Sequence, residues 1–264
     1  MGLFGQNYNA EGPGVSKDAA EKRGFFAFFE LYGRKFTSLV KVNLMYFVLI
    51  LPTLLGFILT GSEYKTAGLI LLLLGLLIFG PATAALTFIV RNLVLGKPVW
   101  MISDFKDQFK ANFKQSLFLG ILDILLPVVL YYSFRYYIGL GGLASFMAGA
   151  MVILASALFA MLNFYAYPMM VTFKLDVKYI IRNSMFFSIA KFPRNILILA
   201  IDTLILYAML KINALVVIFG FAPFILFSTI CFITVFGVWK PMADVMIPKK
   251  DEDDERVFSD GDEK

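Results

Sequence analysis

The sequence predicts an all-α, polytopic membrane protein with six transmembrane helices, and three observations support this fold class. Of its 264 residues, 59% are hydrophobic and only 16% are charged, whereas a soluble domain is nearer half apolar and a quarter charged. The mean hydropathy is +0.78, and apolar runs recur that approach the roughly twenty residues a helix needs to cross the hydrocarbon core. The basic residues also alternate between linkers, as membrane topology requires.

The six spans follow from the apolar runs, which we place at residues 42–60, 67–90, 117–133, 143–171, 196–210 and 215–238. The fifth run is short, and we expect its helix to extend past Lys211, whose ammonium can reach the interface. Each span has a proline in it or at its edge, which membrane helices tolerate. These prolines are Pro52, Pro81, Pro127, Pro168, Pro193 and Pro223.

The distribution of basic residues predicts the orientation of the spans. Of the 24 lysines and arginines, 21 fall in the N-terminal region, the two long linkers and the C-terminal tail. The short loops between paired spans hold only Lys65, Arg135 and Lys211. Because positive residues collect on the cytoplasmic side, we expect a multi-pass protein of the plasma membrane with both termini in the cytoplasm.

Aromatic residues at helical spacing predict three cytoplasmic amphipathic helices. The first face holds Phe25, Phe28, Phe29, Tyr32 and Phe36, and the second holds Phe105, Phe109 and Phe113, each followed by a lysine. Asp176 is a candidate N-cap for the third helix. These faces either lie at the inner headgroup boundary or pack against the helix bundle.

The spans and amphipathic helices suggest an internal repeat of three helix-hairpin units, at about 17–95, 99–171 and 176–246. A flexible segment, 1–16, is expected before this membrane domain and an acidic disordered tail, 247–264, after it. Asp123 lies ten residues after Phe113, and Asp202 lies ten residues after Phe192. The same offset from Phe36 reaches Tyr46, so the first unit lacks the acid, and Asn43 is its nearest polar group.

Several classes of chemistry are excluded by composition. The chain has no histidine and a single cysteine, which excludes histidine-based nucleophile arrangements, histidine metal sites and an intramolecular disulfide. There is no glycine-rich phosphate loop that ends in Lys-Ser or Lys-Thr. The net charge of +5 reflects topology and does not indicate nucleic acid. We therefore expect no enzymatic activity, no cofactor and no metal site.

The most informative residues are two acids inside apolar spans, Asp123 in LFLGILDILL and Asp202 in ILILAIDTLIL. An intramembrane carboxylate is costly and should find a partner or stay protonated. One hypothesis is a site for a proton, a cation or a sugar hydroxyl. The other, which we favour, is a hydrogen-bonded clamp between helices, with Thr83, Thr87, Asn163 or Arg91 as partner. The candidate intramembrane polar site is Asp123, Asp202, Asn43, Arg91 and Asn163.

Several segments resemble the YesL-like bacterial membrane proteins. They are FGPATAALTFIVRNLVLGKP (79–98), DFKDQFKANFKQSLFLGIL (104–122), YPMMVTFKLDVKYIIRNS (167–184) and the opening MGLFG with EGPG (1–14). The resemblance implies a small integral membrane domain without an established activity, commonly encoded beside carbohydrate ABC importers in Gram-positive bacteria. The acidic tail is a departure from the family.

The resemblance favours a non-enzymatic accessory protein in carbohydrate uptake or polysaccharide utilisation. Its partners would be the lipid bilayer and ABC importer permease subunits. The chain lacks the EAA-type cytoplasmic loop of such permeases, so it does not resemble the permease itself. The alternative is a small secondary carrier that uses Asp123 and Asp202, and a membrane-bound enzyme is a third, weaker class.

Overall fold

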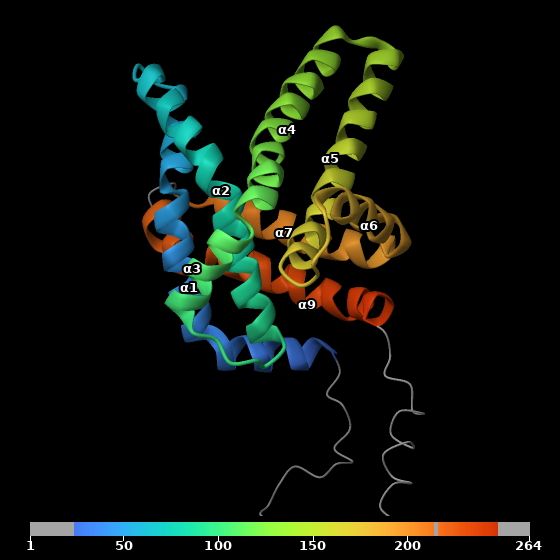
Figure 1. Cartoon of the computed structure of the whole chain (residues 1–264). Helices are drawn as coiled ribbons and strands as arrows, with labels where there is room; N and C mark the ends of the chain where they lie inside the picture. Colours follow the sequence, from blue (N-terminus) through green and yellow to red (C-terminus); the bar gives the residue numbers. More distant parts are fainter. Residues whose placement is uncertain (1–23, 214–215, 248–264) are drawn as a thin grey trace, which may run out of the picture. The chain divides into compact units, whose positions relative to one another are not determined.

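The computed structural model describes residues 24–213 and 216–247, and in this part of the chain all regular structure is helical. The expected flexible segment 1–16 and the tail from residue 248 onward lie outside the described residues. The helices, shown in Figure 1, are α1 (Gly24–Thr60), α2 (Lys65–Val94), α3 (Met101–Ala111), α4 (Phe113–Leu140), α5 (Gly142–Met170), α6 (Val177–Ala190), α7 (Phe192–Lys211), the π-helix η1 (Val217–Leu226) and α9 (Phe227–Met246).

The chain divides into two units, Met1–Arg34 and Lys35–Lys264. In the first unit the aromatic side chains of α1 contact one another. The rings of Phe28 and Tyr32 stack with centroids 5.9 Å apart. The sequence predicts a separate amphipathic helix here, and this prediction is wrong, because α1 runs for 37 residues and joins that segment to the first span.

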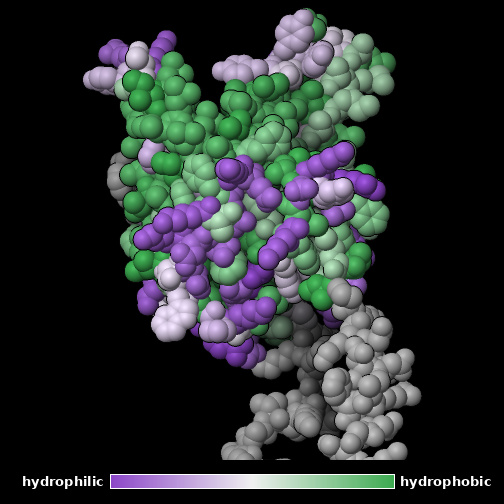
Figure 2. Space-filling view, in the orientation of Figure 1, coloured by the Kyte–Doolittle hydropathy of each residue, from purple (hydrophilic) through white to green (hydrophobic). Residues whose placement is uncertain are grey.

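Six helices are long and apolar enough to cross a membrane, which confirms the predicted number of spans. These candidates are Gly24–Thr60, Lys65–Val94, Phe113–Leu140, Gly142–Met170, Phe192–Lys211 and Gly220–Met246. Large apolar side chains on them are exposed, such as Leu73 and Leu154, as expected of surfaces that face lipid. On the face shown in Figure 2, apolar residues cover the long helices in the upper part of the view, and hydrophilic residues gather lower down, where α3 lies.

The last two spans differ from the prediction in detail. The helix of the fifth span reaches a membrane-spanning length by starting earlier, at Phe192, and it ends at Lys211 instead of extending past it. The Lys211 ammonium lies over the ring of Tyr207, 5.1 Å from its centroid. The sixth span begins as a π-helix that contains Pro223, and the sequence pattern did not predict this change of bonding.

Small residues lie at the contacts between consecutive long helices. Between α1 and α2, a Cβ atom on Gly75 would lie 2.9 Å from the Cα of Thr53, and nearer the helix ends a Cβ atom on Gly68 would meet the backbone of Thr60. Between α4 and α5, Gly149 lies against Ile138. Glycine is needed at the α4–α5 turn itself, where φ is +69° at Gly141 and +82° at Gly142.

The shorter helices α3 and α6 pack on the long ones. Phe105 of α3 is buried, and its helix contacts α2. The predicted second aromatic face is divided, since α3 ends at Ala111 and Phe113 begins α4. Asp176 has the extended backbone of an N-cap before α6, but its side chain makes no capping hydrogen bond.

A group of buried apolar residues lies mostly where α5, α6, α7 and α9 meet. Tyr165 of α5 stacks on Phe187 of α6, with ring centroids 5.3 Å apart. Met169 and Met242 are fully buried beside them. This core fixes the positions of α5 and α9, which form two walls of the cavity described below.

The backbones of α2 and α4 approach closely where the two helices cross. A Cβ atom built on Gly120 would lie 2.5 Å from both the N and the Cα of Gly80. A Cβ atom on Gly80 would collide with the backbone carbonyl of Ser116. Small residues at such crossings allow backbones to approach in membranes.

Replacing Gly120 by alanine is therefore expected to push α2 and α4 apart. The expected loss is about 1–2 kcal/mol of unfolding free energy, because overpacking against backbone cannot be relieved by a rotamer change. The measurement is the thermal unfolding midpoint of the purified protein in detergent. Gly139→Ala is the matched control on the same helix, since no atom lies within 4 Å of its Cβ. Equal midpoints for the two variants would contradict the close crossing.

Candidate functional site

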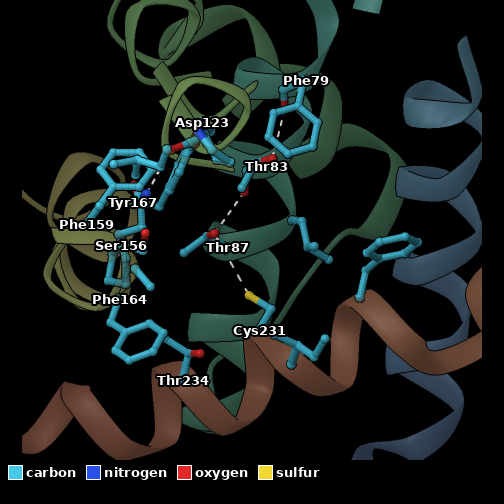
Figure 3. A pocket seen from close by; sticks show the side chains of 18 of the residues that line it. Phe79, Thr83, Thr87, Asp123, Ser156, Phe159, Phe164, Tyr167, Cys231 and Thr234 are labelled. Carbon is cyan, nitrogen blue, oxygen red and sulfur yellow. Dashed lines mark hydrogen bonds between the residues drawn. The ribbon is translucent and has the colours of Figure 1, made fainter. Parts of the chain in front are cut away.

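A cavity of about 700 Å³ lies among α1, α2, α4, α5 and α9. Its walls are mostly apolar and aromatic, with Phe79, Phe159 and Phe164 among them (Figure 3). All of the residues that line it belong to the membrane-span candidates. The volume falls within the range of about 300–1,000 Å³ that is typical of small-molecule sites.

Among the described residues that line the cavity, Asp123 of α4 is the only aspartate, glutamate, lysine or arginine. Asn163 of α5 donates a hydrogen bond from Nδ2 to its Oδ1 over 2.8 Å. Tyr167, one turn further along α5, donates from its hydroxyl to Oδ2 over 2.5 Å. Figure 3 shows Asp123 and Tyr167 facing each other from the two helices. The sequence predicted Asn163 as a partner but missed Tyr167, although its spacing of i+4 from Asn163 places both on one helical face.

Hydroxyl groups of α2 line the opposite side of the cavity. Thr83 and Thr87 donate to the carbonyl oxygens of Phe79 and Thr83, each over 2.8 Å. The hydroxyls of Tyr46 and Thr83 are 3.0 Å apart. The Sγ atom of Cys231, on α9, contacts Thr87 Oγ1 at 3.9 Å. Figure 3 shows this series of side chains leading from α2 to α9.

Asp202 of α7 does not line the cavity. It is buried, with 6% of its surface exposed, and its Oδ2 accepts a hydrogen bond from Thr234 of α9 over 3.3 Å. Thr234 does line the cavity, so Asp202 lies behind it. Among the described residues, Asp202 Oδ1 has no hydrogen-bond partner.

Three residues that share one sequence offset each bind another long helix. Tyr46, Asp123 and Asp202 occupy the same offset in the three predicted units, and each is hydrogen-bonded to the second long helix of its own unit. The pairs are Tyr46–Thr83, Asp123–Asn163 and Asp202–Thr234. The repeat position therefore holds a polar contact between helices in all three units, although the side chains that make it differ.

Asn43 makes a different kind of contact, between the first and last spans. It is fully buried, and its Nδ2 donates to the carbonyl oxygens of Ala222 and Pro223 over 2.7 and 2.8 Å. Its Oδ1 accepts the backbone N–H of Ser228 over 2.7 Å. These groups lie where η1 gives way to α9, and a change from i→i−5 to i→i−4 bonding leaves one carbonyl without an intrahelical donor. Asn43 supplies the missing partner.

Arg91 contacts neither acid. Its guanidinium donates to the carbonyl of Val171 over 3.0 Å and to Thr172 Oγ1 over 2.9 Å, at the end of α5. It also donates to Asn92 Oδ1 and lies over the ring of Phe88. A cation at the C-terminal end of a helix satisfies its last carbonyls and complements its dipole, so Arg91 fixes α2 against the end of α5.

Asn195 is a further buried contact that the sequence did not predict. Its Oδ1 accepts the hydroxyl of Tyr165 over 2.7 Å, and its Nδ2 donates to the carbonyls of Phe187 and Ser188 over 3.0 Å each. It thereby ties α7 to α5 and to the end of α6. The sequence did contain a signal for this contact: Asn195 lies two residues after Pro193, in the first turn of a helix whose next residues are apolar.

The chemistry open to this site is hydrogen bonding and charge complementarity in an apolar cavity. The structure brings together two of the five predicted site residues, Asp123 and Asn163, and places Asp202, Asn43 and Arg91 at separate contacts between helices. Within residues 24–213 and 216–247, no three acidic or cysteine side chains come together in a group that could hold a metal ion.

Fold and site together define a helical protein with six candidate membrane spans and a cavity within them. A family described as "Protein of unknown function, DUF624" matches residues 39–134. That region runs from α1 into α4, so it includes Asn43 and Asp123 but neither Asn163 nor Asp202. Neither the curated proteins nor the solved structures contain a match to this chain.

Proposed function

We propose that the chain is a non-enzymatic accessory protein of carbohydrate uptake, which acts in the plasma membrane through helix contacts with a permease subunit of an ABC-type importer. The carbohydrate connection rests on the resemblance to YesL-like proteins. The proposed architecture is three helix hairpins with both termini in the cytoplasm. It is supported by the hydrogen bonds within each pair of long helices and by the unequal distribution of basic residues between the linkers.

One observation carries the choice of class: several buried polar side chains of the spans bind other helices. Three of these side chains donate hydrogen bonds to backbone carbonyls of a neighbouring helix: Asn43, Asn195 and Arg91. Asp202 accepts a hydrogen bond from Thr234 of α9. Buried polar groups that are satisfied in this way stabilise a particular packing of helices, which suits a protein whose role is to present a defined surface.

A secondary carrier is the second candidate, and Asp123 favours it, because this carboxylate reaches the cavity wall. A carrier that uses both acids would also require Asp202 to reach the transported species, and Thr234 lies between Asp202 and the cavity. The accessory role is the better supported of the two.

Reporter fusions test the proposed topology. Fusions after Leu95 and Asn183 should report a cytoplasmic position, and fusions near Lys65 and Arg135 should report an external one. The reason is that basic linkers are retained on the cytoplasmic side during insertion. An external signal after Asn183 would contradict the three-hairpin arrangement.

Crosslinking in the native membrane tests the proposed role. The expected result is recovery of an importer permease subunit only when the crosslinker is present, together with no uptake of labelled mono- or oligosaccharides by liposomes that contain the purified chain alone. A preparation without crosslinker is the control. Liposome uptake without any recovered transporter component would replace the accessory role by the carrier, and a stable but inactive Asn variant at both Asp123 and Asp202 would point the same way.

A further inference from the structure

We propose that the cavity binds a single-chain amphiphile that enters from the bilayer between α4 and α5 and whose head group donates hydrogen bonds to the polar wall around Asp123. This ligand site goes beyond the accessory role and does not depend on a connection with carbohydrate. Three features of the cavity support it: its mouth, its polar wall and its apolar walls.

The mouth of the cavity is marked by lining residues that are also exposed. Tyr131 on α4 and Ile153 on α5 line the cavity, and each has 57% of its surface exposed. Both lie in membrane-span candidates, so the medium outside the mouth is lipid. Other lining residues, such as Thr87 and Val235, are buried. A ligand that reaches this cavity through the mouth comes from the hydrocarbon layer.

The polar groups of the cavity wall leave mainly acceptors for a ligand. The hydroxyl protons of five lining residues are already donated to other groups. Thr83, Thr87 and Ser156 donate to carbonyls one turn back in their own helices. Tyr167 donates to Asp123, and Thr234 donates to Asp202.

The remaining lone pairs belong to these hydroxyl oxygens, to the Asp123 carboxylate and to Asn163 Oδ1, which has no hydrogen-bond partner among the described residues. No basic residue lines the cavity, so nothing in its wall offsets that carboxylate. The complementary head group is a hydrogen-bond donor, either an ammonium or a hydroxyl.

The rest of the cavity suits an alkyl chain. From Asp123 towards the mouth, the α4 side of the wall continues through Pro127, Leu130 and Phe134. Tyr131 lies eight positions after Asp123, and eight steps along a helix cover about 12 Å. A ligand with its head beside Asp123 therefore places its chain along these apolar side chains and towards the lipid-facing mouth.

Binding is measured by native mass spectrometry of the full chain released from micelles that contain one probe each. The probes are cetylamine, cetyl alcohol and methyl palmitate, which share a long chain and differ in whether the head can donate. The expected result is at least about tenfold stronger retention of a donor head than of the ester, since hydrogen bonds in such a site are strong. The amine and alcohol arms show which donor the site takes. Equal retention of all three probes would overturn the proposal.

Two pairs of variants locate the bound probe. Ala160→Phe fills the cavity, because Ala160 lines it, and should abolish retention of the preferred probe. Ala155→Phe, on an exposed position of the same helix, should leave retention unchanged.

The second pair of variants tests the acceptor. Asp123→Asn replaces an acceptor oxygen by a donor and should reduce retention of the probe at least about tenfold. Asp202→Asn, behind Thr234, should leave retention unchanged. Retention that survives Ala160→Phe, or falls equally with Asp202→Asn, would place the probe elsewhere and refute the site.

Discussion

Replacing Asn43 by leucine should lower the unfolding free energy by about 3 kcal/mol, because three backbone groups lose a hydrogen bond and a buried group left unsatisfied costs about 1–3 kcal/mol. These groups are the carbonyls of Ala222 and Pro223 and the N–H of Ser228. The measurement is the thermal unfolding midpoint in detergent, together with the yield of folded protein.

The matched control for Asn43→Leu is Asn183→Leu, at a partly exposed position on α6. Its midpoint should stay close to that of the wild type, because no backbone group is left without a partner. Asn43→Asp separates the two halves of the contact: it keeps the acceptor for Ser228 but loses the donor for the two carbonyls, so it should also destabilise. A wild-type midpoint for Asn43→Leu would show that the junction of η1 and α9 does not need the Asn43 amide.

The second large effect is expected at Asp123. Asp123→Leu leaves the Asn163 amide and the Tyr167 hydroxyl without their acceptor and should cost about 2–4 kcal/mol. Asp123→Asn keeps an acceptor oxygen and should remain folded with a midpoint near that of the wild type. The thermal midpoints of both variants in detergent provide the measurement.

Asp202 supplies the comparison for Asp123. It has one hydrogen bond, at 3.3 Å, and one oxygen without a partner, so Asp202→Leu should cost at most about 1 kcal/mol. We therefore predict that the Asp202→Leu variant is more stable than the Asp123→Leu variant. The reverse order would contradict the assignment of Asp123 as the stronger clamp between helices.

The spans were predictable from the sequence because hydropathy depends on composition over a window and not on which helices are neighbours. All six runs were found, and their errors are at the ends, as at Phe192 and Lys211. The offset that relates Asp123 to Asp202 was also visible, and both residues make a hydrogen bond to another helix. The extension of α1 through the aromatic segment was not predicted, because an amphipathic face and an apolar run look like two elements when the chain between them carries charges.

The partners of the polar residues were harder to predict, because they depend on how each helix is rotated and on which helices adjoin. Asn163 was identified as a partner of Asp123, but Arg91 was a candidate partner for the same acid and instead binds the end of α5. Nothing local indicates that Asn43 meets residues near Pro223. The π-helix could not be predicted for a related reason. Its bonding is stabilised by the amide of Asn43, which belongs to the first span and not to the sixth.

The contact between Asn43 and Ala222 also sets an order of events during synthesis. The two residues are separated by 179 positions in the chain, and ribosomes add about 5–20 residues per second. Asn43 is therefore made roughly 10–40 s before its partners exist. During that interval the Asn43 amide cannot make its native hydrogen bonds, so the packing of the first span against the last forms only after the last span has been made.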